Sequence, residues 1–168
     1  MVLPWCKTDT AGCCDLQHLE FGKYQASASK EEDNYPKLEG SFYASASPIQ
    51  PVVNLTADQP SAPAVIHLGR KAGVLTGKVV DAVSGKVLED SNFEFHWVSD
   101  PRIFLRGTGL YSKNPRILIP SDTPVTLVVH VRGHEDWVYS LGRGELKDAI
   151  LLRPGEVLAL DIRVWPKL

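Results

Sequence analysis

The sequence predicts an all-β protein whose main body is an antiparallel β-sandwich. Its 168 residues include 12 prolines and 13 glycines, which divide the chain into short apolar runs. Within these runs the apolar residues alternate with a period of two, which is typical of half-buried strands, rather than the 3.6 of a helix. Many short strands separated by turn residues are typical of sandwiches and barrels. Strands do not alternate with helical segments, so a parallel sheet is not expected.

The predicted strands of the C-terminal hundred residues follow one another at short intervals. The first covers residues 74–81 and ends in a polar turn. The second covers residues 93–97, where strict alternation puts three aromatic side chains on one face and Glu94 and His96 on the other. The remaining predicted strands are residues 102–105, 116–119, 125–131, 136–140, 149–152 and 157–164. Together these strands are enough for one complete sandwich.

The N-terminal part of the chain resembles a second copy of the back half of this sandwich. Its apolar runs keep the order and spacing of runs near the C-terminus, which predicts an internal repeat whose front strands are missing. The matching runs are residues 16–28, 51–55 and 64–68 against residues 117–129, 150–152 and 158–162. A half-sandwich cannot cover its own apolar face and leaves open strand edges. We therefore predict a partial repeat in residues 1–69, which either packs on the complete domain of residues 70–168 or begins before Met1 in the natural protein.

Charge and hydropathy exclude two classes of partner. The formal net charge is −2 and the isoelectric point is near 6.2, so the chain offers no basic footprint for nucleic acid. No apolar run approaches the roughly 18–20 residues needed to span a bilayer, so no membrane insertion is predicted. The first residues also lack the cationic start and apolar stretch of a secretory signal. The expected partner is therefore a protein or a glycan, and the oligomeric state stays open.

Two segments resemble carboxypeptidase regulatory-like domains. Residues 73–86 read GVLTGKVVDAVSGK and are similar to that family's opening, in which a strand with a G-x-V-x-D pattern leads into a turn with Ser or Thr before Gly. Residues 8–24 read TDTAGCCDLQHLEFGKY and are similar to its T-D-x-x-G-x-F-x-L…G-x-Y segment. The second segment departs from the family at Cys14, where an aromatic residue is usual. The resemblance implies a transthyretin-like (prealbumin-like), Greek-key sandwich related to immunoglobulin-like folds.

The same resemblance implies a function. Domains of this family are usually accessory modules on exported or bacterial envelope proteins, and their fold is shared with carbohydrate-binding modules. They bring no catalytic residues or cofactor, and the sequence contains no nucleophile elbow or triad that we can defend. We therefore expect a non-enzymatic structural or docking module, with carbohydrate binding as the alternative. The family's export conflicts with the absent secretory signal, so localisation stays open, and the resemblance favours an extracellular or cell-envelope place over the cytoplasm.

The residues predicted to bind a carbohydrate are Trp137 and Tyr139. They lie two apart on one predicted strand face next to a loop, and a flat exposed aromatic pair would suit the apolar face of a sugar. The alternative interpretation is that both pack in the core or against the repeat. Trp97 shares a face with Phe93 and Phe95, so we expect it in the core.

A polar cluster near residue 130 invites a metal-site hypothesis. His130 and His134 are accompanied by Glu135 and Asp136, all of which are residue types that ligate metals. The two histidines are separated by a Gly in a predicted turn, so their convergence is not implied. We predict a polar hairpin tip at this position and no metal site.

Two further residue sets carry weaker hypotheses. Lys78, Glu94 and Asp161 lie on predicted first, second and last strands, an arrangement similar to Cna B-type domains that form an internal Lys–Asp or Lys–Asn amide. That chemistry needs a buried Lys with a depressed pKa, whereas the alternation predicts that Lys78 faces solvent. The only cysteines are Cys6, Cys13 and Cys14. Their spacing does not suit a metal site, and we expect them to be free thiols without a structural role.

Overall fold

The computed structural model describes residues 4–37, 42–43, 50–108, 116–140 and 147–167 of the chain. The chain divides into two compact units. The smaller comprises Met1–Ser27 and Ile49–Ile66, and the larger comprises Ala28–Pro48 and His67–Leu168. No helix in the described ranges has both the length and the apolar character needed to cross a membrane.

The described part of the smaller unit contains one pair of strands. β1 (Gly22–Gln25) pairs antiparallel with β2 (Val52–Leu55), so that Gly22 lies opposite Leu55. The apolar run at residues 64–68, which was matched to the strand at residues 158–162, does not form a strand. Alternation shows which face of a strand would be apolar but supplies no neighbour to pair with, and β1 and β2 pair only with each other in the part of this unit that the structure describes. The proposed sequence repeat therefore stays a prediction.

The cysteines of the smaller unit correct a prediction. Cys6 and Cys14 form a disulfide whose Cα atoms are 6.2 Å apart, and Cys13 is an exposed free thiol. The expectation of three free thiols was wrong because sequence spacing does not show that a turn brings residues 6 and 14 together. In this turn the backbone N–H of Asp9 donates to the carbonyl of Cys13 at 2.8 Å.

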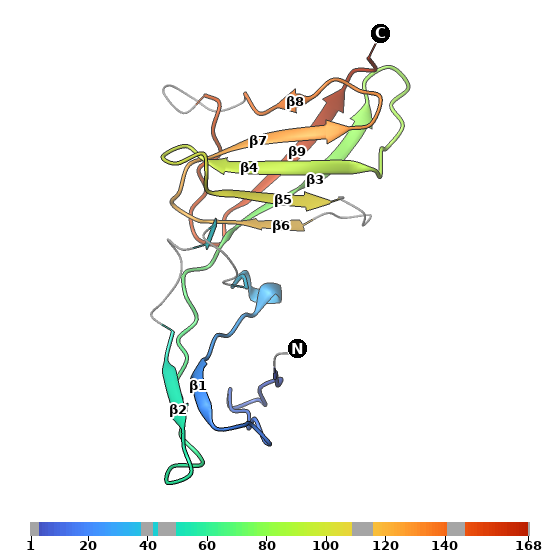
Figure 1. Ribbon diagram of the computed structural model, residues 1–168. Coiled ribbons are helices and arrows are strands. Elements are labelled where there is room, and N and C mark those ends of the chain that lie inside the picture. Colours follow the sequence, from blue (N-terminus) through green and yellow to red (C-terminus); the bar gives the residue numbers. More distant parts are fainter. Residues whose placement is uncertain (1–3, 38–41, 44–49, 109–115, 141–146, 168) are drawn as a thin grey trace. The chain divides into compact units, whose positions relative to one another are not determined.

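The larger unit is a β-sandwich, and it confirms the all-β prediction. Figure 1 shows its two sheets as layers, with β4 and β7 in front of β3 and β9 and running at an angle to them. One sheet has the order β6-β3-β9 and the other the order β5-β4-β7-β8. The strands are β3 (Gly73–Asp81), β4 (Ser91–Trp97), β5 (Phe104–Thr108), β6 (Arg116–Ile119), β7 (Val125–Val131), β8 (Trp137–Val138) and β9 (Val157–Val164). A 3-10 turn, η1 (Glu31–Asp33), precedes them.

The core lies between these two sheets and follows the predicted alternation. Along β7 every second residue is buried, and Leu127 and Val129 are fully enclosed. On β4 the buried positions include Phe93 and Phe95, while Ile162 contributes from β9 in the opposite sheet. Burial of this apolar surface is the main force that holds the sheets together, at about 25 cal/mol per Å².

The strand boundaries agree with the sequence prediction where alternation is long. Residues 116–119, 125–131 and 157–164 are strands with the predicted bounds. The strand predicted at residues 102–105 is displaced to Phe104–Thr108, and the one predicted at residues 136–140 is shortened to Trp137–Val138. Residues 149–152 contribute only an isolated bridge between Ile150 and Val125. The prediction of Greek-key connections stays a prediction.

One strand pair differs from the expected antiparallel pattern. The first and last strands of the sandwich, β3 and β9, pair in parallel, with Gly77 opposite Leu160 and Lys78 opposite Asp161. All the other strand pairs of the described structure are antiparallel. Turn residues indicate which consecutive strands pair with each other. β3 and β9 are far apart in the sequence, so no turn connects this pair directly. Local patterns therefore could not reveal its direction.

The sandwich also includes a segment that the sequence analysis placed in the N-terminal repeat. Phe42 is buried in the sandwich core, and its ring lies 6.3 Å from that of Phe95. Its carbonyl accepts a hydrogen bond from the indole Nε1 of Trp97 at 3.1 Å. The Tyr43 hydroxyl donates to the Leu118 carbonyl at 2.8 Å, and burial raises the pKa of Tyr43 to about 12. The larger unit is thus built from residues 28–48 as well as from residues 67–168.

Candidate functional site

The predicted carbohydrate-binding pair does not form a flat exposed platform. Tyr139 is buried in the core and Trp137 is partly buried against it. Their rings meet edge to face, with centroids 6.3 Å apart and an interplanar angle of 73°. Trp97, which we expected in the core, is partly buried and packs against it. Sugar binding by Trp137 and Tyr139 stays a prediction, and the geometry found there is that of packing.

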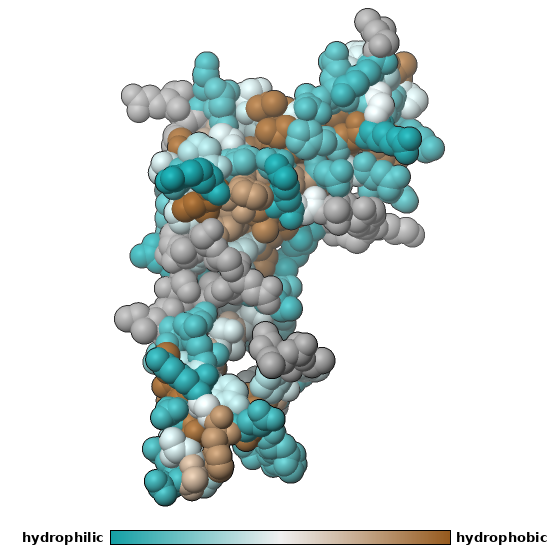
Figure 2. Space-filling model, in the orientation of Figure 1, coloured by the Kyte–Doolittle hydropathy of each residue, from teal (hydrophilic) through white to brown (hydrophobic). Residues whose placement is uncertain are grey.

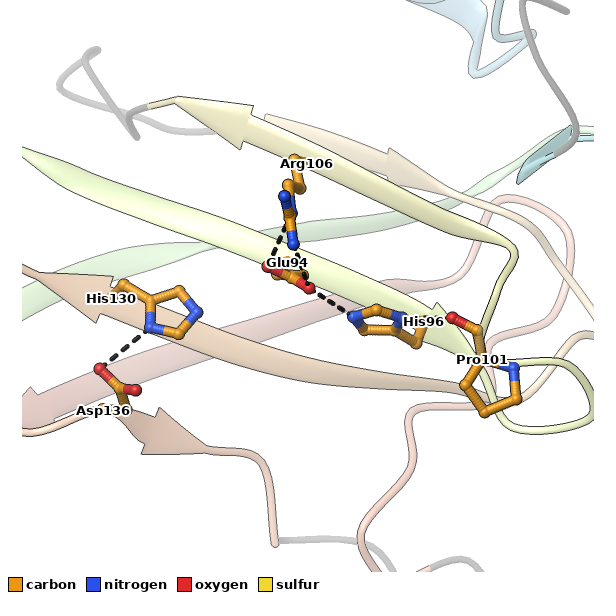
Figure 3. Close-up of polar contacts among 6 residues, drawn as sticks. All are labelled: Glu94, His96, Pro101, Arg106, His130 and Asp136. Atoms are coloured by element: carbon orange, nitrogen blue, oxygen red, sulfur yellow. Dashed lines mark hydrogen bonds and ion pairs between the residues drawn. The ribbon is translucent and has the colours of Figure 1, made fainter.

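A network of polar side chains lies on one side of the four-stranded sheet. We call this surface the outer face, because it points away from the core. Its polar network comprises two parts, which are drawn in Figure 3. The residues that define the outer face are Asn92, Glu94 and His96 on β4, Phe104 and Arg106 on β5, His130 on β7 and Asp136 just before β8. Pairing between neighbouring strands places these residues side by side.

The first part of the network is centred on Glu94. Arg106 lies directly opposite Glu94 in the β4–β5 register, and its guanidinium donates from Nε at 2.8 Å and from Nη2 at 3.1 Å to the two carboxylate oxygens. His96 Nε2 contacts Glu94 Oε1 at 2.6 Å, and His96 Nδ1 contacts the carbonyl oxygen of Pro101 at 2.6 Å. Because both ring nitrogens face acceptors, both contacts are hydrogen bonds when each nitrogen carries a proton.

These contacts make Glu94 a well-held carboxylate. Hydrogen bonds from Arg106 and then from His96 lower the pKa of Glu94, and the carboxylate in turn raises the pKa of Arg106. Only 18% of the Glu94 side chain is exposed, against 67% of the Arg106 side chain. The guanidinium also lies over the Phe104 ring, 5.1 Å from its centroid. Arg106 is therefore fixed in place by a bidentate ion pair and a cation–π contact while remaining open to solvent.

The second part of the network joins β7 to the start of β8. His130 Nδ1 and Asp136 Oδ1 are 2.9 Å apart. His130 lies opposite Asn92 across the β4–β7 ladder. Between the two parts lies a hollow of about 390 Å³, whose lining includes Asn92, Glu94, Arg106 and His130. Its lining brings polar side chains from β4, β5 and β7 to one space.

Exposed apolar side chains accompany this network on the outer face. Phe104 is 47% exposed and Val138 is 53% exposed. Figure 2 shows hydrophilic and hydrophobic residues interspersed over the face that carries β4, β5 and β7. A surface of this mixed kind resembles the rim and polar contacts of a non-obligate interface more than the apolar interface of a permanent oligomer.

The cluster near residue 130 is a polar hairpin tip, as predicted. Its two histidines bind different carboxylates, since His130 contacts Asp136 whereas His134 Nε2 contacts Asp81 Oδ2 at 2.8 Å. His134 and Asp81 are both nearly buried, and together they connect the hairpin after β7 to the end of β3. Within the described ranges, no three His, Cys, Asp or Glu side chains gather closely enough to hold a metal ion.

The structure separates the residues of the amide hypothesis. Lys78 and Asp161 do meet, with Nζ and Oδ2 3.8 Å apart, but both side chains are more than half exposed. Glu94 lies on the outer face of the other sheet. The Lys78 side chain faces solvent, as alternation predicted, and the buried Lys with a neighbouring acid that the cross-link requires is not assembled.

The sequence pointed to four side chains of the outer-face network, Glu94, His96, His130 and Asp136, but not to Arg106. Alternation placed Glu94 and His96 on one side of their strand, away from the aromatic core residues. Arg106 was missed because it lies beyond the strand predicted at residues 102–105, and the structure moves that strand to Phe104–Thr108. A signal existed, since Phe104 and Arg106 alternate with Leu105, but only the hairpin register puts Arg106 opposite Glu94.

Comparison with known proteins adds little to this geometry. No protein-family model matches the sequence, and a search of curated proteins finds no match. Among solved structures, the chain is similar to 3-chlorocatechol 1,2-dioxygenase from Rhodococcus opacus 1CP, with 11% sequence identity and a TM-score of 0.39. The similarity covers 57% of this chain and 60% of the dioxygenase chain, so the match spans less than two thirds of that enzyme. A similarity of this size carries no argument about function.

Proposed function

We propose that this chain is a non-catalytic interaction module that docks an acidic protein partner through the outer face of its four-stranded sheet. The observation that carries the proposal is the state of the ionisable side chains there. Glu94 is paired with Arg106 and His96, and His130 is paired with Asp136. Groups tied to one another in this way form a rigid pattern of donors and acceptors, whereas a general acid or base must exchange its proton with a substrate.

The exposed guanidinium of Arg106 favours an acidic partner at its position on the outer face, which also carries Asp136 paired with His130. Glu94 is largely covered, while Arg106 stands over it in solvent. A partner that approaches from solvent therefore contacts the Arg106 guanidinium before it reaches the Glu94 carboxylate. Arg is enriched at protein interfaces because its planar group forms several hydrogen bonds at once and stacks on aromatic rings.

Two features support a place outside the cytosol. The Cys6–Cys14 disulfide is of the kind that persists in oxidising compartments. Accessory modules of the family that the sequence resembles are usually carried by exported or envelope proteins. We therefore propose that the module acts on an exported or envelope assembly, where it docks or spaces its partner.

A second candidate function is carbohydrate binding on the same face. It is favoured by the exposed ring of Phe104 next to the polar hollow, because an aromatic ring beside hydrogen-bonding groups suits a sugar. In this alternative the ring of Phe104 takes the place that the sequence analysis assigned to Trp137 and Tyr139.

Site-specific photo-crosslinking in the cells that make the protein tests the proposal. A benzoylphenylalanine replaces Val138, an exposed residue of the outer face, and in a matched control it replaces Arg163, an exposed residue on the other sheet. We expect one discrete protein adduct from position 138, none from position 163, and loss of the adduct when Arg106→Ala is added.

The remaining outcomes decide against protein docking. If position 138 gives no adduct, or if both positions give the same adducts, the outer face is not a docking surface. If the mass added at position 138 is that of a glycan, carbohydrate binding replaces protein docking as the function.

A further inference from the structure

The hollow on the outer face is lined by groups from both neighbours of β4. Arg106 lies opposite Glu94 on the β5 side, and His130 lies opposite Asn92 on the β7 side. These residues line a single space of about 390 Å³. That volume is within the range of small-ligand sites, which are about 300–1,000 Å³. The hollow is therefore large enough to admit one functional group together with the atoms that carry it.

Arg106 lines this hollow and has guanidinium donors that Glu94 does not use. A guanidinium has five N–H donors in a planar fork, and Glu94 accepts from Nε and from one N–H of Nη2. The donors that remain are on Nη1 and on the other side of Nη2, and they form the second edge of the fork. Since Glu94 and the Phe104 ring hold the group in place, little side-chain entropy is lost when this edge binds a ligand.

His130 and Asn92 add donors on the other side of the hollow. The contact between His130 Nδ1 and Asp136 uses one ring nitrogen and orients the ring, so that Nε2 is the nitrogen left for a ligand. Nε2 donates to a carboxylate only when the ring carries a proton on both nitrogens. The Asn92 side chain carries both a carbonyl oxygen and an NH₂ group. A ligand that accepts hydrogen bonds on two coplanar oxygens matches the Arg106 edge, and these residues can then bind its remaining lone pairs.

The surrounding charge selects the type of acceptor. Glu94 and Asp136 bring two carboxylates to the rim, balanced by Arg106 and by the two histidines when they are protonated. A phosphate dianion would be repelled by the carboxylates of Glu94 and Asp136. A carboxylate ligand carries only one negative charge, so this repulsion is weaker, and the group is planar. Bidentate pairing with Arg favours that planar geometry.

We propose that the hollow between Arg106 and His130 binds a carboxylate group, with the second edge of Arg106 as its principal donor. The inference rests on the proposed docking function, for which it names the group of the partner that is recognised. The carboxylate belongs to an Asp or Glu side chain of the acidic partner, and an acidic sugar would present the same chemistry.

Titration of the full chain by ¹H–¹⁵N NMR tests the site directly. The probes are acetate, N-acetylglutamate α-amide and glucuronate, with glucose and inorganic phosphate as comparisons. We expect saturable shifts of the Asn92, Gly107 and His130 amides and of the Arg106 Nε–H signal, with a dissociation constant on the order of 1 mM for a lone carboxylate. Glucose should cause no such shifts, and phosphate should bind more weakly than acetate.

Matched variants separate the guanidinium edge from general charge. Arg106→Gln and Arg106→Lys should each weaken carboxylate binding at least about tenfold, because Lys keeps the charge but lacks the planar fork. Arg102→Gln should leave the affinity unchanged, since Arg102 is an exposed arginine that pairs with Asp100 away from the hollow. Amide signals distant from β4 and β5 report whether each variant keeps its fold, and the Arg106 Nε–H signal tests the unmodified protein without any substitution.

Several results would overturn the inference. One is the absence of saturable shifts up to about 20 mM carboxylate. Another is phosphate binding as tightly as acetate. The third is a loss of carboxylate binding in Arg102→Gln as large as the loss in the Arg106 variants. If carboxylates fail while the crosslink from position 138 persists, the docking function stands and this inference alone is wrong. Binding of glucuronate but not of N-acetylglutamate α-amide would support the carboxylate site and contradict the protein partner.

Discussion

At the residue scale, the pair of Asp81 and His134 shows how one side chain can organise both a turn and a contact between sheets. Asp81 Oδ1 accepts hydrogen bonds from the backbone N–H groups of Val83 and Ser84 and from the Ser84 hydroxyl. Its Oδ2 contacts His134 Nε2 at 2.8 Å. The turn after β3 and the hairpin after β7 therefore share one carboxylate.

We predict that this pair makes stability depend on pH in two directions. Hydrogen bonds from Ser84 and then from His134 hold the pKa of Asp81 well below its ordinary value of 3.8, and the bond to Asp81 raises the pKa of His134 above 6.5. A lowered carboxylate pKa stabilises the fold above its ordinary value, and this contribution is lost as the pH falls toward the folded value. A raised histidine pKa stabilises the fold below 6.5, and this contribution is lost as the pH rises through the folded value.

The measurement is the melting temperature of the wild type and of His134→Gln from about pH 3 to about pH 9. The two proteins should differ most near pH 5, and the difference should shrink on the alkaline side. His67→Gln, which replaces an exposed histidine, should melt like the wild type throughout. A difference that does not change with pH would show that the charge of His134 plays no part.

At the element scale, the parallel pair of β3 and β9 joins the beginning of the sandwich to its end. The two strands come close together at Gly77, where φ is +148°. A Cβ atom at this position would lie 1.9 Å from the carbonyl oxygen of Leu160. The G-x-V-x-D pattern places a glycine here, but a sequence pattern does not show the backbone conformation that requires it. Residues other than glycine rarely adopt such a φ. Both the backbone conformation and the lack of space beside Leu160 therefore exclude a side chain at position 77.

We predict that Gly77→Ala lowers the free energy of unfolding by at least about 2 kcal/mol, because β3 and β9 must separate or strain. Urea denaturation followed by tryptophan fluorescence measures this change. Gly107→Ala is the matched control, since a Cβ there meets nothing within 4 Å, and it should cost less than about 0.5 kcal/mol. Wild-type stability of Gly77→Ala would mean that β9 does not lie as close to β3 as described.

At the scale of the whole molecule, the sandwich depends on a segment that precedes it in the sequence. Phe42 is 2% exposed and packs with Phe95 in the core. The backbone N–H of Ala72 donates to the Asn34 carbonyl at 2.7 Å, and the Arg116 guanidinium donates to the Asn34 side chain. A boundary at residue 69 or 70 would therefore remove part of the core along with the predicted repeat.

We predict that Phe42→Ala in the full chain destabilises the larger unit by about 3 kcal/mol or more, as expected for loss of a buried aromatic ring. Phe21→Ala is the matched control, because that ring is 63% exposed in the smaller unit, and it should change stability by less than about 0.5 kcal/mol. Chemical denaturation monitored by the near-ultraviolet signal of the sandwich aromatics distinguishes the two. If Phe42→Ala is as stable as the wild type, the assignment of residues 28–48 to the larger unit is contradicted.

The sequence by itself determined the all-β class, three strands with their bounds, and the side of β4 on which Glu94 and His96 lie. Apolar alternation has a period of two along each strand, so it involves only neighbouring residues and can be recognised from the sequence alone. The tertiary structure alone decided the parallel pairing of β3 with β9, the insertion of Phe42, and the meeting of Arg106 with Glu94. Each of these joins residues through register or packing. A local pattern does not carry that information, because apolar alternation specifies which face is buried but not what covers it.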